Sequence, residues 1–190
     1  ACSTSGEALA LASMSAAAGY GGTMIAVTSS HFGSAEKEFR FPLGYANQRP
    51  LSSHWTVTGS GAFLVQSAEE YRKQNTKSYF SNIRITGVTV GKIVDYGLKD
   101  SQNMGACMAP AAMDTIVQNF QDMERKEKDY DRIITGDLGS VGQKLLFELL
   151  DENHKDIKKN HMDCGMQIFD AGSQDTHAGG SGCACSALML

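Results

Sequence analysis

Ala1-Cys2-Ser3-Thr4-Ser5-Gly6-Glu7 opens the chain, followed by Ala8-Leu-Ala-Leu-Ala-Ser-Met-Ser-Ala-Ala-Ala18 and then by Gly19-Tyr20-Gly21-Gly22. Residues 3–18 are rich in Ala and Leu and carry one charge, which predicts a buried helix that ends near Gly19. Cys2 then lies at the helix N-terminus, where free backbone N–H groups and the helix dipole favour a thiolate or a bound anion. The alternative is a small cysteine buried in a tight turn. No strand precedes the helix in this sequence, so we expect a fragment of a longer fold.

The rest of the chain alternates strand-like and helix-like segments, which predicts an α/β fold with a parallel sheet. Residues 32–54 lack clear periodicity and are expected to form an irregular insertion, and residues 69–81 a polar surface loop. A glycine-rich turn at residues 179–182 enters a last apolar helix. The expected strands are 23–29, which is apolar and predicted to be buried, 55–66, 83–94, 132–136 and 166–169, and the expected helices further along are 114–125 and 141–150.

Composition limits the possible functions. A length of 190 residues suits one domain or slightly more, and 42% hydrophobic with 20% charged residues is ordinary for a globular protein. A net charge of −4 provides no surplus of Lys and Arg to neutralise phosphates, which argues against nucleic-acid binding as the main role. Five cysteines without a sign of secretion predict reduced thiols.

As a nucleophile, Cys2 needs a base, and the sequence offers five histidines. His161 lies in a polar turn before an apolar run, and His31 directly follows a predicted strand, where α/β folds place their sites. A structural role stays open for each histidine. A second possibility is a zinc site with His161, Cys164, Cys183 and Cys185 as ligands, although their spacing is unusual for zinc. Backbone N–H groups of the turn at residues 179–182 could hold an anion.

The two ends of the chain resemble each other. Small residues and cysteine precede an apolar helix both at Cys2 and at Gly182-Cys-Ala-Cys-Ser186. Such a match arises by chance, or from a duplicated fold whose halves contribute equivalent helices to one site.

Several longer motifs carry a resemblance to a known family. The chain resembles the thiolase-like superfamily, and within it a family of sporulation proteins from spore-forming bacteria. The motifs are the Cys2 opening, Thr28-Ser-Ser-His31, Phe39-Arg-Phe-Pro42, Thr56-Val-Thr-Gly-Ser-Gly-Ala62, Asp100-Ser-Gln-Asn-Met-Gly105, Met108-Ala-Pro-Ala-Ala112, Ile134-Thr-Gly-Asp-Leu138, His161-Met-Asp-Cys-Gly165 and Ala178-Gly-Gly-Ser-Gly-Cys-Ala-Cys-Ser186. The resemblance implies a thiolase-like fold of two similar α/β/α/β/α halves, incomplete here at both termini. Residues 1–100 would be the remainder of the first half, and residues 101–190 most of the second.

The resemblance also implies binding of dipicolinate (pyridine-2,6-dicarboxylate), without a cofactor and without catalysis. Cys2 matches the nucleophile position of condensing enzymes, and His161 is expected to be its partner. Where such enzymes place an Asn, this chain has Gly-Ser-Gly-Cys, so a donor that stabilises a thioester enolate is missing. A Cys-dependent condensing enzyme or acyltransferase is the alternative. The expected ligand-binding residues are Cys2, Ser29, His31, His161, Asp163, Gly180 and Ser181.

The same resemblance implies partners for this protein. They are dipicolinic acid, with calcium as a candidate companion ion that Asp163 could meet, and other subunits of the spore dipicolinate uptake complex. Asp163 is otherwise expected to orient His161. A homodimer is also implied, located in the forespore or spore at the periphery of the inner membrane. We expect Cys2 to be a neutral thiol when the ligand is bound, because a thiolate would repel a dianion.

Overall fold

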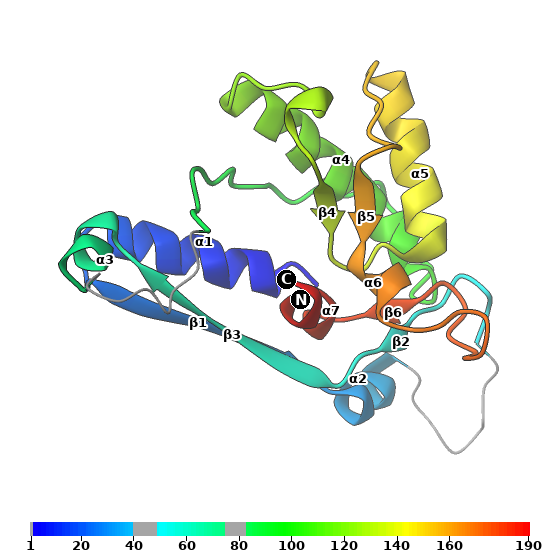
Figure 1. The fold of residues 1–190 in the computed structure, drawn as a ribbon. Coiled ribbons are helices and arrows are strands. Elements are labelled where there is room, and N and C mark those ends of the chain that lie inside the picture. The colour runs from blue at the N-terminus through cyan, green and yellow to red at the C-terminus, as the bar shows by residue number, and fades with distance from the viewer. Residues whose placement is uncertain (1, 40–48, 75–82) are drawn as a thin grey trace.

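The computed structural model describes residues 2–39, 49–74 and 83–190. The Ala- and Leu-rich stretch forms α1 (Thr4–Ala17), as predicted, and Gly19 follows its end with a φ of 79°. This helix packs along an antiparallel ribbon of β1 (Thr23–Ser30) and β3 (Gly59–Gln66) (Figure 1). Together these elements form the elongated lower part of the molecule.

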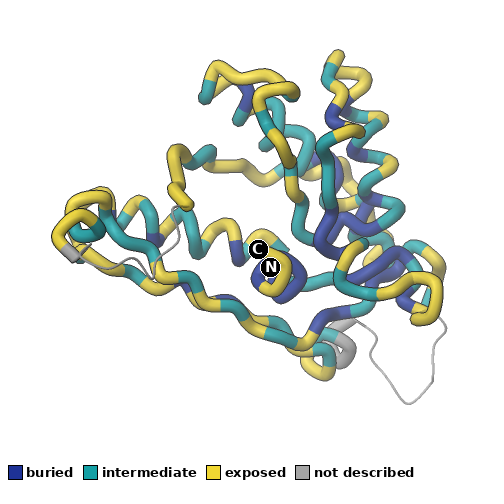
Figure 2. Tube along the Cα trace, in the orientation of Figure 1, coloured by how far each residue is buried: buried dark blue, intermediate teal, exposed yellow. Residues whose placement is uncertain are grey.

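The ribbon is covered on one face only. Ala26 and Thr28 of β1 are buried on the side of α1, whereas Ile25 and Val27 on the opposite side are 66% and 61% exposed. The expectation of a fully buried strand is therefore wrong, because successive strand residues point to opposite faces and α1 covers one of them (Figure 2). α1 is likewise buried only along its inner side, at Ser5, Ala12 and Ala16.

The second part of the molecule is built on two helices. α4 (Met104–Asp122) crosses α5 (Gly139–Glu152), and the parallel strands β4 (Ile133–Thr135) and β5 (His161–Asp163) lie beside them (Figure 1). A Cβ atom added to Gly105 would lie 2.7 Å from the backbone N of Gly142, so glycine permits this crossing. The core between these elements contains Ala109, Phe120, Leu138, Leu146, Leu150 and Ile157.

Short elements join the two parts. β2 (Trp55–Thr56) pairs in parallel with β6 (Gly180–Ser181), and α6 (Cys164–Gln167) leads from β5 towards them. The last helix, α7 (Ala184–Met189), packs on β3 and α1, so the two ends of the chain lie side by side at the centre of the molecule (Figure 1). The helices and small sheets agree with the α/β prediction. The expected parallel sheet does not form among the described residues, because the longest strand pair, β1 with β3, is antiparallel and the two parallel pairs are short and separate.

Four predicted segments differ from the structure. Residues 32–54, expected to be irregular, contain α2 (Phe32–Phe39), and residues 40–48 lie outside the described part. Residues 69–74 of the expected loop 69–81 belong to α3 (Ala68–Gln74), and residues 75–81 lie outside the described part. No strand forms at residues 166–169: residues 166 and 167 end α6, because the Asp163 side chain accepts a hydrogen bond from Met166 N and caps a helix there. Residues 83–94 form no strand. They lie along α4, held by an Asn119–Thr89 hydrogen bond of 2.9 Å and a Lys92–Asp114 ion pair of 2.8 Å.

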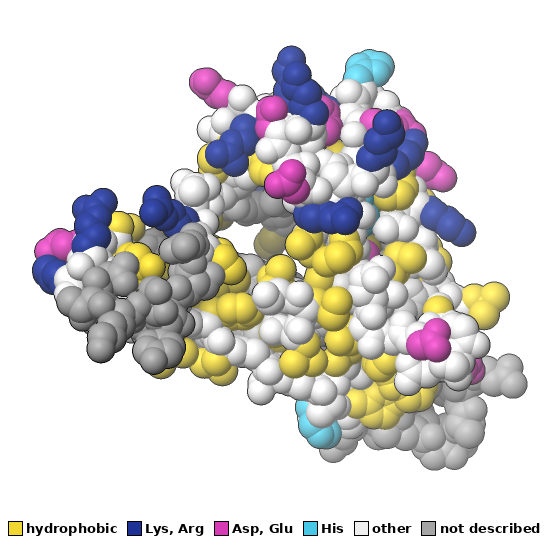
Figure 3. Space-filling view, in the orientation of Figure 1, with side chains coloured by type: hydrophobic (Ala, Val, Ile, Leu, Met, Phe, Trp, Pro, Cys, Tyr) yellow, Lys and Arg dark blue, Asp and Glu magenta, His cyan; other side chains and the backbone are white. Residues whose placement is uncertain are grey.

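Charged and hydrophobic side chains gather on different parts of the surface. Figure 3 shows charged side chains over the helical part at the top of the view and at the left end, and hydrophobic side chains over the centre. Across the residues that the structure describes, no helix is both long and apolar enough to cross a membrane.

Candidate functional site

Cys2 lies half-buried in the turn before α1, as the sequence predicts. The first turn of α1 is fixed to the loop before α7. There the Ser5 hydroxyl donates to the Cys183 carbonyl oxygen at 2.8 Å and lies 3.0 Å from Thr28 Oγ1. This buried contact joins residues far apart in the sequence and holds the two helix N-termini close together.

The partner of the Cys2 thiol is Asp137, in the loop between β4 and α5. The two side chains share a hydrogen bond, and Asp137 Oδ2 also accepts from Gly182 N at 2.8 Å. Asp137 is only 4% exposed. His161, the expected partner of Cys2, instead makes its hydrogen bonds with Thr135 and Gln143.

This environment keeps the thiol neutral. Burial raises the pKa of Cys2 well above its usual range, and the charge and hydrogen bond of Asp137 raise it further. Burial also raises the pKa of Asp137, although its hydrogen bonds with Cys2 and Gly182 act in the opposite direction. Because the thiolate is the nucleophilic form, Cys2 has the reverse of the surroundings that activate a catalytic cysteine.

Asp163 lies near Asp137 and is held by four hydrogen bonds. Oδ1 accepts from the Thr135 hydroxyl at 2.6 Å and from Leu138 N at 2.8 Å. Oδ2 accepts from Gly139 N at 3.0 Å and from Met166 N at 3.2 Å. Asp163 is 1% exposed and serves the N-terminal ends of both α5 and α6.

His161 is held by a network of its own. Since Thr135 donates its hydroxyl hydrogen to Asp163, its oxygen accepts from His161 Nε2–H at 3.0 Å. His161 Nδ1 then accepts from the Gln143 side-chain amide at 3.1 Å, and Phe147 packs edge-on against the ring. Burial lowers the pKa of His161, with the charge of Asp163 opposing that shift. Thr135 thus links Asp163 to His161, and the orienting role of Asp163 stays a prediction.

His54 is a polar group near this site to which the sequence assigned no role. It precedes β2, is 9% exposed, and donates from Nε2 to the Leu138 carbonyl oxygen at 3.1 Å. Its Nδ1 has no hydrogen-bond partner among the described residues. His54 is close enough to Asp137 for a positive charge on it to lower the pKa of that carboxyl.

The glycine-rich turn reaches the site through its backbone. Gly182 N donates a hydrogen bond to Asp137 Oδ2. Gly165 lies between Gly180 and Asp137 in such close packing that a Cβ atom on Gly165 would lie 2.5 Å from Gly180 O. The Ser181 hydroxyl lies 3.3 Å from Thr56 Oγ1. The structure thus brings Gly180 and Ser181 close to Asp137 and Asp163.

Ser29 and His31 lie apart from this cluster. The Ser29 side chain is exposed on the ribbon face opposite α1, and only its carbonyl oxygen reaches the site by accepting from Cys183 Sγ at 3.0 Å. His31 is exposed and accepts from Gly33 N at 3.2 Å. Both were expected to bind ligand, and neither side chain contacts Cys2 or Asp137 in the structure.

The other cysteines are free and mostly buried. Burial, reinforced by the charges of Asp163 and Asp137, raises the pKa of Cys164 to about 11, and burial raises that of Cys185 further. Within the described ranges, no group of three or more His, Cys, Asp or Glu side chains is arranged to hold a metal ion. The zinc set that was weighed from the sequence is therefore not assembled.

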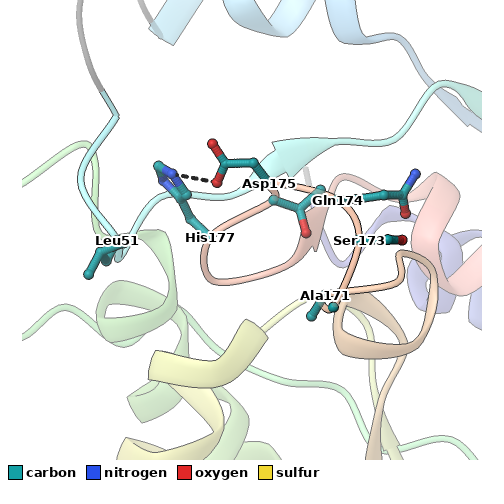
Figure 4. Close-up of a pocket in the computed structure, with 8 residues that line it drawn as sticks. Leu51, Ala171, Ser173, Gln174, Asp175 and His177 are labelled. Atoms are coloured by element: carbon teal, nitrogen blue, oxygen red, sulfur yellow. Dashed lines mark ion pairs between the residues drawn. The ribbon is translucent and has the colours of Figure 1, made fainter.

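The clearest surface cavities lie elsewhere. One of about 420 Å³ is lined by Leu51 and residues 171–177, with an ion pair of 2.9 Å between His177 Nε2 and Asp175 Oδ1 (Figure 4). A second of about 270 Å³ lies between α4, Thr89 and the start of β4. Neither is lined by Cys2 or Asp137.

Asp137 could have been found from the sequence. It follows the predicted strand 132–136, which ends at Gly136, and polar residues directly after strands face sites in α/β folds. The same argument singled out His31. His54 and Gln143 offered no comparable pattern.

The comparisons with known proteins cover the whole chain. The family model described as "Stage V sporulation protein AD (SpoVAD)" matches residues 1–190. Stage V sporulation protein AD of Bacillus subtilis (strain 168) is 43% identical over 189 residues, which is 100% of this chain and 52% of that protein. The chain thus spans about half the length of the curated relative that it matches.

Proposed function

The chain belongs to the stage V sporulation protein AD family, a family of sporulation proteins, and we propose that it binds dipicolinate without chemical turnover. The observation that carries this proposal is the position of Cys2 at the N-terminus of α1 against the buried carboxyl group of Asp137, which raises the pKa of the thiol. A site built this way presents polar hydrogens and a helix dipole to a bound carboxylate. Its carboxyl group raises the pKa of the thiol, which is the opposite of the activation that an acyl-transferring cysteine needs.

Two further features support a binding role. The Ser5–Cys183 hydrogen bond sets the N-terminal ends of α1 and α7 together, so both helix dipoles direct partial positive charge to one region. Dipicolinate is a planar dianion, and two carboxylates suit two such helix ends. This arrangement also supports a thiolase-like fold with duplicated halves, divided near residue 100, in which α1 and α7 are equivalent helices.

The biological setting is part of the proposal. As a member of a sporulation family, the protein would act in the forespore or spore, at the periphery of the inner membrane. Its partners would be the other subunits of the machinery that takes dipicolinate into the developing spore, with a homodimer as its own assembly.

Isothermal titration calorimetry of the protein with dipicolinate tests the binding role. We expect saturable heat, weakened at least tenfold by Cys2→Leu, because a larger apolar side chain fills the mouth of α1 and removes the thiol donor. Cys107→Leu is the matched control, since Cys107 is exposed on α4 and its replacement should leave binding unchanged. Absence of heat with the folded wild-type protein contradicts the proposal.

Intact-mass measurement after incubation with acyl-CoA tests the absence of turnover. We expect no adduct on Cys2, because its thiolate is scarce at neutral pH. An acyl adduct that is lost in Cys2→Ala would instead indicate an acyltransferase.

A further inference from the structure

Two carboxyl groups are buried where the proposed site holds a dianion. Asp137 is 4% exposed and Asp163 is 1% exposed, and each influences the other electrostatically. None of the ion pairs found among the described residues includes either aspartate. An anion that binds beside them meets like charges in a region of low dielectric, so one charge must be removed or compensated.

The two aspartates differ in the hydrogen bonds that they accept. Asp163 accepts four hydrogen bonds, three of them from backbone N–H groups that have no other acceptor at these helix ends. Asp137 accepts one backbone hydrogen bond, from Gly182, and interacts with the Cys2 thiol. Protonation of Asp137 therefore disturbs one backbone hydrogen bond, whereas protonation of Asp163 would disturb a cluster of three.

The Cys2 thiol links Asp137 to the ligand side of the site. Cys2 is half-buried, whereas Asp137 lies behind it with almost no exposed surface. An ionised Asp137 can only accept, so it draws the S–H hydrogen inward and leaves sulfur lone pairs facing an incoming anion. A protonated Asp137 can donate its own hydrogen to Cys2 Sγ, which frees the S–H hydrogen to point outward.

We propose that the protein binds its anionic ligand with Asp137 protonated, so that Asp137 O–H donates to Cys2 Sγ and Cys2 S–H donates to a ligand carboxylate oxygen. Asp137 is thus a positioning residue that sets the direction of the thiol hydrogen. When the free protein holds Asp137 ionised, one proton passes from solvent to this carboxylate on binding, and no bond between heavy atoms forms or breaks. The inference rests on the proposed dipicolinate site.

Other titratable groups surround Asp137 on every side. They are Cys2 before α1, His54 before β2, Asp163 on β5, Cys164 on α6 and Cys185 on α7. The three thiols stay neutral because burial raises the pKa of each. Asp163 adds a negative charge that favours protonation of Asp137, and a proton on His54 would oppose it.

Infrared difference spectroscopy of the dipicolinate complex, combined with calorimetry across about pH 5.5–8.5, tests the inference. We expect the carbonyl band of a protonated carboxyl group in the wild-type complex and its loss in Asp137→Asn. The Asn side chain donates to sulfur as a protonated Asp137 would, so Asp137→Asn should bind dipicolinate with little dependence on pH. Wild-type affinity should fall by up to tenfold per pH unit wherever Asp137 begins to ionise.

The controls separate the possible outcomes. Asp170→Asn changes an exposed carboxylate and should retain wild-type binding, and His54→Gln should retain the protonated-carboxyl band. A wild-type complex without that band, loss of binding in folded Asp137→Asn, or binding that requires calcium with Asp137 ionised would overturn the inference while the proposed function stands. A folded wild-type protein that binds no dipicolinate would instead overturn the proposed function, and this inference with it.

Discussion

The Cys2 thiol forms a hydrogen bond with Asp137, which is distant from it in the sequence and almost completely buried. Gly182 N fixes the same carboxyl group at 2.8 Å. Three distant segments thus meet at one carboxyl group. The charge and hydrogen bond of Asp137 raise the pKa of the thiol and so control its reactivity.

Cys2 should react slowly with iodoacetamide at about pH 8, and Asp137→Asn should accelerate the reaction roughly threefold or more. The substitution removes a charge and a hydrogen bond that both raise the pKa of Cys2, so the thiolate becomes more abundant. Peptide mass spectrometry over time gives the rate at each cysteine. Exposed Cys107 is the internal reference, and its rate should not change. Equal rates at Cys2 in both proteins would show that Asp137 does not control the thiol.

Asp163→Asn should lower the free energy of unfolding by about 2–4 kcal/mol. An amide has one acceptor oxygen, so its NH2 group would face backbone N–H donors that the carboxylate now satisfies at α5 and α6. Urea unfolding followed by circular dichroism measures the loss. Asp156→Asn is the control, since exposed Asp156 accepts one backbone hydrogen bond, and it should change stability by less than about 1 kcal/mol.

Gly105→Ala should destabilise the protein by about 3 kcal/mol, because the new Cβ atom would lie 2.7 Å from backbone atoms of α5 and force the helices apart. Gly6→Ala is the matched control within α1, where an added Cβ meets nothing within 4 Å. That variant should be more stable by up to about 1 kcal/mol, since Ala favours helix more than Gly. Thermal unfolding of both variants compares them, and a similar effect at both positions would contradict the close α4–α5 crossing.

Stability should fall as the pH drops below about 6.5, and His161 should contribute to that fall. Burial lowers the pKa of His161 in the folded protein, so between the folded and unfolded values the unfolded chain binds more protons. Acid therefore favours unfolding across this interval, and the stability that a neutral His161 provides is fully present above it. His161→Asn should show a smaller difference in unfolding free energy between about pH 7.5 and 5.5.

His154→Asn is the control for this pH effect. His154 is exposed and has a φ of 56°, a conformation that Asn tolerates well. The His154→Asn variant should keep the wild-type dependence of the unfolding free energy on pH. An unchanged dependence in His161→Asn would show that other groups cause the acid destabilisation.

Local sequence determined most of the helices and strands. The Ala-rich run before Gly19 is sufficient for α1, and the apolar spacing of residues 141–150 is sufficient for the core of α5. Where tertiary contacts compete with local pattern, the predictions were wrong. The apolar residues 166–169 were predicted as a strand, but Asp163 caps a helix there, and residues 83–94 have strand-like composition without a paired strand in the described part.

The sequence by itself placed Cys2 at a helix N-terminus, because helix boundaries depend on nearby residues. Only the tertiary structure decided what faces that thiol. His161 and Asp137 are both polar residues associated with short apolar strands, and spacing along the chain does not show which one the fold brings to Cys2. That choice depends on the packing of α5, β5 and α7 around Asp137, and through it the structure determines whether the thiol is activated or kept neutral.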